Sequence, residues 1–214
     1  MGARFISDRR TWRRDAGVFI LALLCVLAIA LLQRSGVLDG LNVGAMAAAG
    51  DARAISPAIT SLMLAASWIG DTVGRIAIII AATALLLWRG RRSRAQWLAL
   101  VMAGGTLLNL GLKQIFAAPR PDLLPHLDIV HSYSFPSGHA AGNMMLFGAL
   151  AMLAGRRGGY VLAFMAIALI GVSRVWLGVH WPSDVLAGWV EGLGWLFLCR
   201  YWLPAGRGQQ QRIL

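Results

Sequence analysis

Three cationic side chains mark the parts of this 214-residue chain that could do chemistry. Lys113, the only lysine, and the arginines Arg120 and Arg174 each stand at the edge of a long apolar run. Cations that meet at an apolar surface repel one another unless an anion joins them, and phosphate is an anion that Arg and Lys bind well. The sequence therefore predicts that these three residues bind a phosphate group.

The segment Phe135-Pro136-Ser137-Gly138-His139 has the pattern of a helix start, with Ser137 as the N-cap. Free backbone N–H groups and the positive end of the helix dipole favour an anion at such a position. Glycine at 138 allows the anion to approach the backbone closely. We expect Ser137 and the Gly138 backbone to complete the phosphate site.

A second predicted helix start, His180-Trp181-Pro182-Ser183-Asp184, places a carboxylate four residues after a histidine. At that spacing Asp184 can accept the imidazole N–H, fix the tautomer of His180 and leave its other nitrogen free as a nucleophile. His139 is then the candidate proton donor. A nucleophile, cations and an acid are what phosphoryl transfer requires.

The carboxylates do not indicate a metal site. Asp122, Asp128 and Asp184 are too few and too scattered for a two-metal centre, and the three cations can balance the charge of the phosphate. We expect neither a metal nor an organic cofactor.

The composition places this chemistry in a membrane. Hydrophobic residues make up 58% of the chain and charged residues 14%, and the mean hydropathy is +0.65, which excludes a soluble enzyme and a disordered chain. Two cysteines exclude a disulfide scaffold. The net charge of +11 could suggest nucleic acid, but the basic residues form short clusters between apolar runs, so we expect no nucleic-acid partner.

These apolar runs predict an all-α integral membrane bundle of six spanning helices. The run from Ile55 to Trp88 is ambiguous because Asp71 and Arg75 interrupt it, so it could hold one span or two. We assign it one span, preceded by an interfacial helix over about 56–68 on the outer face. The chain is then a single membrane domain, 1–214, with spans at about 16–33, 71–88, 95–112, 138–155, 158–173 and 183–202.

The number of spans decides which loops face the cytoplasm, and cytoplasmic loops should be rich in Arg and Lys. With one span in the ambiguous run, 14 of the 20 basic residues lie inside and 6 outside. The candidate site then faces the exterior. We also expect Asp71 and Arg75 to pair at their i, i+4 spacing. The N-terminal run could instead be a signal peptide, but it is long for one, and its removal would leave an odd number of spans.

Three segments together resemble the signature of the type 2 phosphatidic acid phosphatase superfamily. They are Lys113-Gln-Ile-Phe-Ala-Ala-Pro-Arg120-Pro121, Pro136-Ser137-Gly138-His139 and Ser173-Arg174-Val-Trp-Leu-Gly-Val-His180-Trp-Pro-Ser-Asp184. Order and spacing match in all three, and the six predicted spans resemble the membrane branch of this family. The resemblance implies a metal-independent phosphatase that works through a phosphohistidine.

The resemblance also implies a role for each residue. His180 would be the nucleophile, Asp184 its orienting partner and His139 the acid for the leaving oxygen. Phosphate would be bound by Lys113, Arg120, Arg174, Ser137 and the Gly138 backbone. Many members carry a further Arg-Pro pair where this chain has Ala118-Pro119. That departure bears on the preference between monophosphate and diphosphate.

Other polar residues have simpler interpretations. His126 and His131 are expected to be solvated in a loop. An acid at the depth of Glu191 is a functional candidate, but we favour a structural partner role because the signature does not include it. Gly188 and Gly192 form a pair of small residues that is typical of helix packing.

The leading hypothesis is a lipid phosphatase in the inner membrane of a bacterium, with its site on the extracytoplasmic face and the substrate tail in the bilayer. Candidate substrates are undecaprenyl diphosphate, phosphatidylglycerol phosphate, phosphatidic acid and the phosphates of lipid A. The alternatives are a lipid phosphotransferase, an anion or lipid transporter, and a family member that binds lipid phosphates without catalysis. The sequence indicates no oligomeric state.

Overall fold

The computed structural model describes residues 9–204, and within this range the chain is all-α with no strand. It is built from the helices α1 (Arg9–Arg34), α2 (Asp39–Ile55), α3 (Pro57–Gly70), α4 (Thr72–Trp88), α5 (Arg92–Phe116), α6 (Gly138–Ala154), α7 (Arg157–Trp176) and α8 (Pro182–Arg200). The all-α prediction is confirmed.

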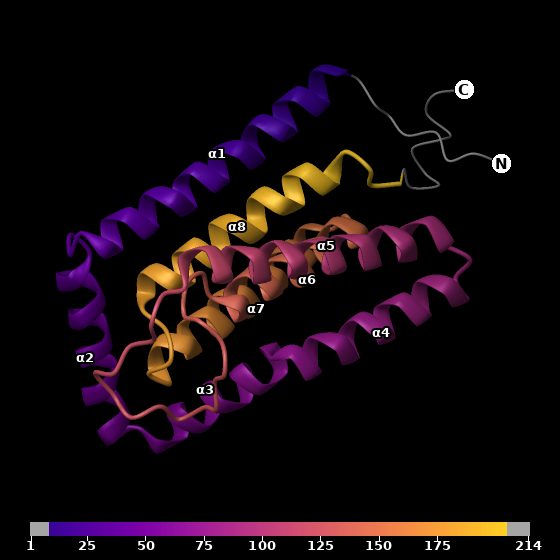
Figure 1. Ribbon diagram of the computed structural model, residues 1–214. Helices are drawn as coiled ribbons and strands as arrows, with labels where there is room; N and C mark the ends of the chain where they lie inside the picture. The colour runs from indigo at the N-terminus through magenta and orange to yellow at the C-terminus, as the bar shows by residue number, and fades with distance from the viewer. Residues whose placement is uncertain (1–8, 205–214) are drawn as a thin grey trace.

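The helices form an elongated bundle in which α6 packs on both α7 and α8 (Figure 1). Helix α1 covers α8, α5 lies against α6, α3 lies along α7 and α4 packs on α5. Helix α2 runs across one end of the bundle and bends by 118° into α3. The long segment between α5 and α6 lies at this same end in Figure 1, so one end of the bundle collects the irregular backbone.

The contact between α6 and α8 depends on glycine. A Cβ atom at Gly188 would come within 2.6 Å of the Ser137 carbonyl oxygen, and one at Gly192 within 2.8 Å of the Ala141 carbonyl oxygen. Small residues at this spacing allow two helix backbones to approach closely. The expectation that these glycines pack helices is confirmed, and their close contact brings the start of α6 beside α8.

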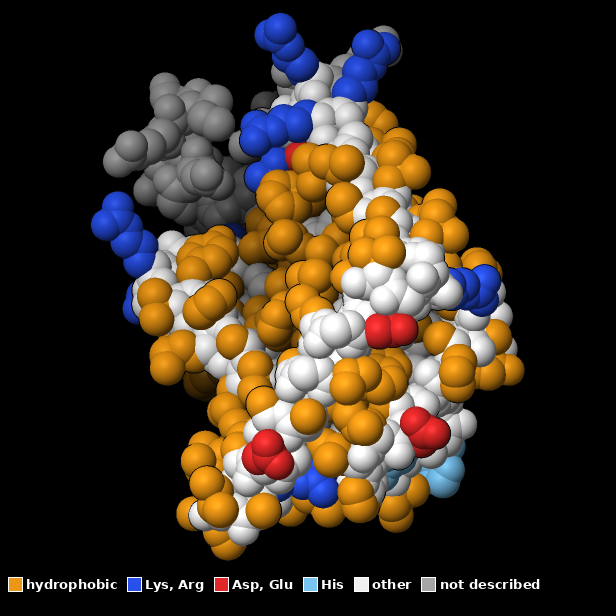
Figure 2. Space-filling view, turned by 90° about the vertical axis from the view of Figure 1, so that its left-hand side faces the viewer, with side chains coloured by type: hydrophobic (Ala, Val, Ile, Leu, Met, Phe, Trp, Pro, Cys, Tyr) orange, Lys and Arg blue, Asp and Glu red, His pale blue; other side chains and the backbone are white. Residues whose placement is uncertain are grey.

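The outside of the bundle is apolar. Large hydrophobic side chains such as Leu21, Leu100 and Phe164 are exposed, and Figure 2 shows hydrophobic side chains over most of the face that it views. By length and composition α1, α5 and α7 could each cross a membrane, the bent pair α2 and α3 could form one more span, and α4 and α6 are shorter apolar helices. The chain is a multi-pass membrane protein.

Helix α2 is absent from the sequence-based prediction. Long uncharged runs are what predict a spanning helix, and Asp39, Asp51 and Arg53 interrupt this segment. The other helices correspond to the expected elements, and α3 takes the place of the interfacial helix. Helices α5 and α7 extend beyond the expected 95–112 and 158–173, so Lys113 and Arg174 lie in their last turns and not in loops.

The predicted ion pair between Asp71 and Arg75 is wrong. Asp71 is the N-cap of α4 and accepts a hydrogen bond from the Gly74 backbone at 2.6 Å. Arg75 Nη1 donates to the Gly70 carbonyl oxygen at 2.8 Å. The capping role of Asp71 competes with pairing, because an N-cap carboxylate must turn back toward the first turn of its own helix.

The arginine clusters between α4 and α5 and between α6 and α7 lie at the bundle end opposite the α5–α6 segment (Figure 1). This arrangement agrees with the segregation of charge on which the predicted orientation depends. Arg4, Arg207 and Arg212, which that prediction counts on the inner side, lie outside the described residues.

Candidate active site

A cavity of about 440 Å³ opens between α4, α5, α6 and the α5–α6 segment. Its lining includes six of the eight predicted site residues: Lys113, Arg120, Gly138, His139, Arg174 and His180. Ser137 and Asp184, which complete the predicted set, are buried, Ser137 next to Gly138 in the chain and Asp184 in contact with His180. The fold therefore brings together three segments that are far apart in the sequence.

His180 and Asp184 interact as their spacing predicts. The Nδ1 atom of His180 lies 3.3 Å from Asp184 Oδ2 and 3.2 Å from Ser134 Oγ. The Ser134 hydroxyl donates to the same carboxylate oxygen at 2.6 Å. Two acceptors therefore face Nδ1, which favours the tautomer with the proton on Nδ1.

The other ring nitrogen of His180 faces the cavity. Arg120 Nη1 lies 3.2 Å from His180 Nε2. A guanidinium can only donate, so Nε2 must accept, and its lone pair points toward the cations of the site. Burial, followed by the positive charges of Arg120, Arg174 and Lys113, holds the pKa of His180 well below its usual value. The ring is neutral and can act as a nucleophile.

Asp184 is held in place by groups that the sequence pattern did not identify. The Gln33 side chain donates to its Oδ1 at 3.2 Å, and the Trp181 backbone N–H donates to Oδ2 at 3.0 Å. Gln33 and Ser134 come from α1 and from the α5–α6 segment. Sequence reasoning had no signal for either, because a single Gln or Ser becomes part of a site only through long-range packing.

Lys113 and Arg120 both donate to backbone carbonyls around the cavity. Lys113 Nζ donates to the Tyr133 carbonyl oxygen at 2.5 Å, and Arg120 donates to the carbonyls of Ser132 and Val179 at 2.9 and 2.8 Å. Burial and then the charge of Arg174 lower the pKa of Arg120 to about 10, so it stays protonated at neutral pH. Both cations face neutral oxygens, which leaves their charge available for an anion.

Arg174 is fixed from one side. Its Nη1 donates to Asp128 Oδ2 at 2.5 Å and also to the Ser67 hydroxyl. Its Nε atom is buried without a hydrogen-bond partner among the described residues. Burial opposes ionisation of Asp128, but the hydrogen bond and charge of Arg174 outweigh it and lower the pKa of Asp128. Asp128 and Ser67 were not predicted as site residues.

The start of α6 has the predicted form. Ser137 is the N-cap, and its side chain accepts from the Ala140 N–H at 3.5 Å. The Ser137 N–H donates to the Asp184 carbonyl oxygen at 3.0 Å, which ties this start to that of α8. His139 lines the cavity, and its Nε2 atom is buried with no partner in the described chain. No group within residues 9–204 occupies that nitrogen.

Further polar residues line the cavity although no pattern singled them out for the site, among them Asn109 and Arg75. Asn109 on α5 donates to Glu191 Oε2 at 2.8 Å, which agrees with the structural role expected of Glu191. Arg75 reaches the cavity from α4. The sequence marks Arg75 as a charge that interrupts an apolar run, but its spacing predicts a pair with Asp71 and not a place in the site.

The described residues contain no group of three or more His, Cys, Asp or Glu side chains with the spacing of a metal site. The charged groups that face the cavity are mainly cations, which suit an anionic ligand.

Comparisons with known proteins agree with this geometry. The profile of a family described as the PAP2 superfamily matches residues 94–207. Phosphatidylglycerophosphatase B of Bacillus subtilis (strain 168) is 36% identical over 112 residues, which are 47% of this chain and 54% of that protein. A lipid A 1-phosphatase of Rhizobium etli is 34% identical over 58% of this chain and 64% of its own.

An undecaprenyl-diphosphatase of Sulfolobus acidocaldarius is 35% identical over 56% of this chain and 60% of its own. The chain therefore spans less than two thirds of the length of these curated relatives. Among solved structures, a transmembrane PAP2 type phosphatidylglycerolphosphate phosphatase from Bacillus subtilis superposes with a TM-score of 0.78 at 25% identity, covering 92% of this chain and 97% of that one.

Proposed function

Because the chain belongs to the PAP2 superfamily, we propose that it hydrolyses a lipid phosphate or diphosphate ester through a phosphohistidine intermediate. The observation that carries the proposal is the placement of His180 Nε2, which faces a cavity lined by Lys113, Arg120 and Arg174. A neutral imidazole surrounded by cations suits attack on a phosphorus atom whose oxygens are negatively charged.

The reaction proceeds in two steps. In the first, the lone pair of His180 Nε2 forms a bond to phosphorus while the bond from phosphorus to the leaving oxygen breaks, and His139 supplies the proton that this oxygen needs. In the structure Arg120 donates to Nε2. When the substrate binds, the same N–H groups donate to the phosphoryl oxygens instead. Asp184 stabilises the positive charge that develops on the His180 ring.

In the second step, water attacks the phosphohistidine. His139, now deprotonated, takes a proton from the water as its oxygen bonds to phosphorus, and the bond from phosphorus to Nε2 breaks. Phosphate leaves, and His180 returns to its neutral form. The cations hold the phosphoryl oxygens in both steps, so no other source of positive charge is needed.

The lining of the cavity supports a substrate with an apolar tail. Ile76 and Ile79 of α4 and Met102 of α5 continue the lining away from the cations. A lipid can place its phosphate among the cations while its tail stays in the bilayer. Candidate substrates are undecaprenyl diphosphate, phosphatidylglycerol phosphate, phosphatidic acid and lipid A phosphates.

The proposed location is the inner membrane of a bacterium, with the cavity open to the extracytoplasmic side. The excess of basic residues at the opposite end of the bundle supports this orientation. A cysteine in place of the exposed Asp122 should react with an impermeant thiol reagent in intact cells. Reaction only after the membrane is broken would reverse the orientation.

The function is tested by measuring phosphate release from the detergent-solubilised protein with a panel of lipid phosphates. The wild type should release phosphate from at least one of them, and His180→Ala should not. Asp122→Asn is the matched control, because this exposed acid lies in the same part of the chain without contacting His180. No release by the wild type, or equal release by His180→Ala, would contradict the proposal.

A further inference from the structure

Arg75 is a fourth cation in the cavity. It lines the same space as His139, Lys113 and Arg174, but it comes from α4, which contributes none of the residues discussed as phosphate ligands above. Its Nη1 donates to the carbonyl oxygens of Gly70 and Gly138, at 2.8 and 3.5 Å, and Nη2 reaches the Thr72 hydroxyl at 3.4 Å.

The position of Arg75 depends on a glycine of α6. A Cβ atom at Gly142 would come within 2.9 Å of both Cζ and Nε of Arg75. The guanidinium therefore lies directly on the first turns of α6, where any other residue at 142 would force it to move. Gly142 is one turn after Gly138, so Arg75 packs against α6 close to the anion-binding start of that helix.

The acceptors of Arg75 are all uncharged. Within residues 9–204, Arg174 is paired with Asp128 and Arg200 with Asp15, but no carboxylate lies within ion-pair distance of Arg75. Lys113 and Arg120, two of the proposed phosphate ligands, have the same kind of surroundings. A guanidinium that faces a cavity and only carbonyl or hydroxyl oxygens retains the capacity to bind an anion with two parallel N–H groups.

Arg75 lies on the side of the leaving group. It contacts the carbonyl of Gly138, which immediately precedes the proposed acid His139, whereas Arg120 contacts the proposed nucleophile His180. Ile76 and Ile79, which follow Arg75 on α4, line the apolar part of the cavity. In an in-line displacement the nucleophile and leaving group are opposite each other. Arg75 is therefore placed between the reacting phosphorus and the lipid tail.

We propose that Arg75 binds a phosphate that remains on the leaving group, and that it thereby selects lipid diphosphates over lipid monophosphates. This inference rests on the proposed function. In a diphosphate the leaving group is itself a phosphate, directly next to the oxygen that departs. The guanidinium neutralises the charge that builds up there as the bond between phosphorus and oxygen breaks.

The test compares farnesyl diphosphate with farnesyl monophosphate, which share one tail and differ only in the second phosphate. Initial rates give kcat/KM on each for the wild type, Arg75→Gln, Arg75→Lys and the control Arg34→Gln. Arg34 is an exposed cation that donates to the Phe116 carbonyl. The wild type should prefer the diphosphate. Arg75→Gln should reduce the ratio of the two kcat/KM values by about tenfold or more, the loss expected when a hydrogen bond to a charged group is removed.

Arg75→Lys should retain part of this ratio, because lysine keeps the positive charge but lacks the two parallel N–H groups of the guanidinium. Arg34→Gln should leave the ratio unchanged. Equal losses on both substrates in the Arg75 variants would mean that Arg75 only supports the cavity wall. An unchanged ratio would also overturn the inference. If the wild type hydrolyses neither these nor any other lipid phosphate, the proposed function itself fails.

A measurement on the wild type does not depend on the folding of a variant. With an aryl phosphate as reporter, inorganic pyrophosphate should compete for the site at a lower concentration than inorganic phosphate. Only pyrophosphate can contact Arg75 and the three proposed phosphate ligands, Lys113, Arg120 and Arg174, at the same time. Equal inhibition constants for the two anions would contradict a second phosphate position beside Arg75.

Discussion

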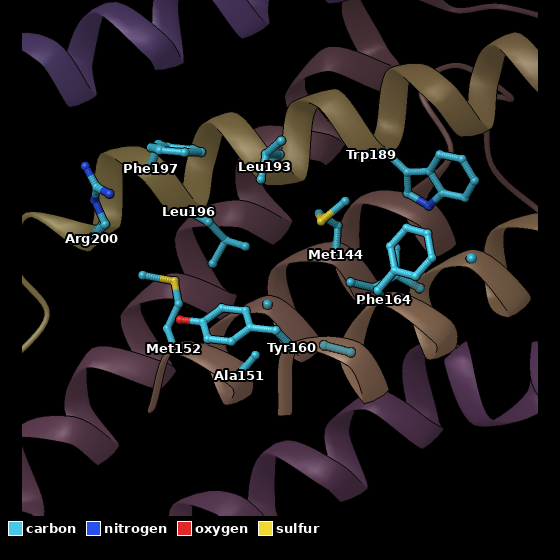
Figure 3. A pocket seen from close by; sticks show the side chains of 14 residues that line it. Met144, Ala151, Met152, Tyr160, Phe164, Trp189, Leu193, Leu196, Phe197 and Arg200 are labelled. Atoms are coloured by element: carbon cyan, nitrogen blue, oxygen red, sulfur yellow. The ribbon is translucent and has the colours of Figure 1, made fainter. Parts of the chain in front are cut away.

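Two cavities of similar size differ in how many charged side chains line them. The site cavity, of about 440 Å³, is lined by arginines, a lysine and histidines. A second cavity, of about 490 Å³ between α6, α7 and α8, is lined mainly by side chains such as Met144, Phe164 and Leu196 (Figure 3). Volume therefore does not distinguish a reactive site in this fold. The placement of charge does, since charged groups in an apolar protein are kept where they bind or react.

Helix α6 lines both cavities. Its first turn, with Gly138 and His139, faces the cations, whereas Gly148, Ala151 and Met152 further along face the apolar cavity. Each cavity also has an arginine paired with an aspartate, Arg174 with Asp128 in one and Arg200 with Asp15 in the other, both at 2.5 Å. The comparison predicts that equivalent changes in the two regions have different consequences.

The largest partial loss of activity is expected at His139. His139→Ala should reduce kcat/KM on an alkyl phosphate by about 10²- to 10⁴-fold, the usual contribution of a general acid. The loss should be much smaller on an aryl phosphate such as nitrophenyl phosphate, whose leaving group departs without a proton. Steady-state rates on both substrates check this, and equal losses would exclude the acid role.

The two arginine–aspartate pairs give a matched comparison. Asp128→Asn should lower kcat/KM by about tenfold through a raised KM, since it weakens a charge-assisted hydrogen bond that holds Arg174 toward the phosphate. Asp15→Asn should leave kcat/KM unchanged but lower the free energy of unfolding by about 1–3 kcal/mol, because it weakens the hydrogen bonds that the partly exposed Arg200 donates to the buried Asp15. Kinetics and thermal unfolding of both variants separate the roles. A raised kcat/KM in Asp128→Asn would instead mean that Asp128 competes with the substrate phosphate for Arg174.

Filling each cavity sharpens the comparison of function. Thr106→Phe, in the site cavity, should raise KM for a long-chain lipid phosphate by about tenfold while a small aryl phosphate is little affected. Ala168→Phe adds a ring to the apolar cavity and should change the KM of neither substrate. A comparable loss from Ala168→Phe would mean that the apolar cavity also takes part in substrate binding.

The smallest effect concerns pH. The low pKa of His180 keeps its ring neutral until the pH falls well below the usual histidine range, so the acidic limb of kcat/KM should lie below that range. Arg120→Gln removes a charge that disfavours the protonated ring, which should raise the pKa of His180 and move the limb to higher pH. Profiles with an aryl phosphate check the direction, and a shift to lower pH would contradict it.

Local spacing explains what the sequence could predict of the site. His180 and Asp184 are only four residues apart at the start of α8, and Ser137 caps the helix that begins one residue later. Such relations need no knowledge of the fold. The three cations could be grouped because each stands at the edge of an apolar run, and the resemblance to one family signature supports the same grouping.

The remaining features depend on long-range packing. Gln33 reaches Asp184 across 151 residues of sequence, and Ser67 reaches Arg174 across 107. Helical spacing predicts Asp71 as the partner of Arg75, but Asp71 caps its own helix and Arg75 donates to the Gly70 carbonyl oxygen instead. Helix α2 was overlooked because its charges interrupt any apolar run, although they are compatible with a helix that lies across the end of the bundle.

The most direct test of the central claim is to trap the phosphoenzyme. The wild type, incubated briefly with a lipid phosphate labelled with ³²P at the reacting phosphate and then quenched in base, should carry label on His180 that is stable to alkali and lost in acid. His180→Ala should carry none, and Asp184→Asn should accumulate it more slowly, since it favours the wrong tautomer. Label that persists in His180→Ala, or that maps to another residue, would contradict the account.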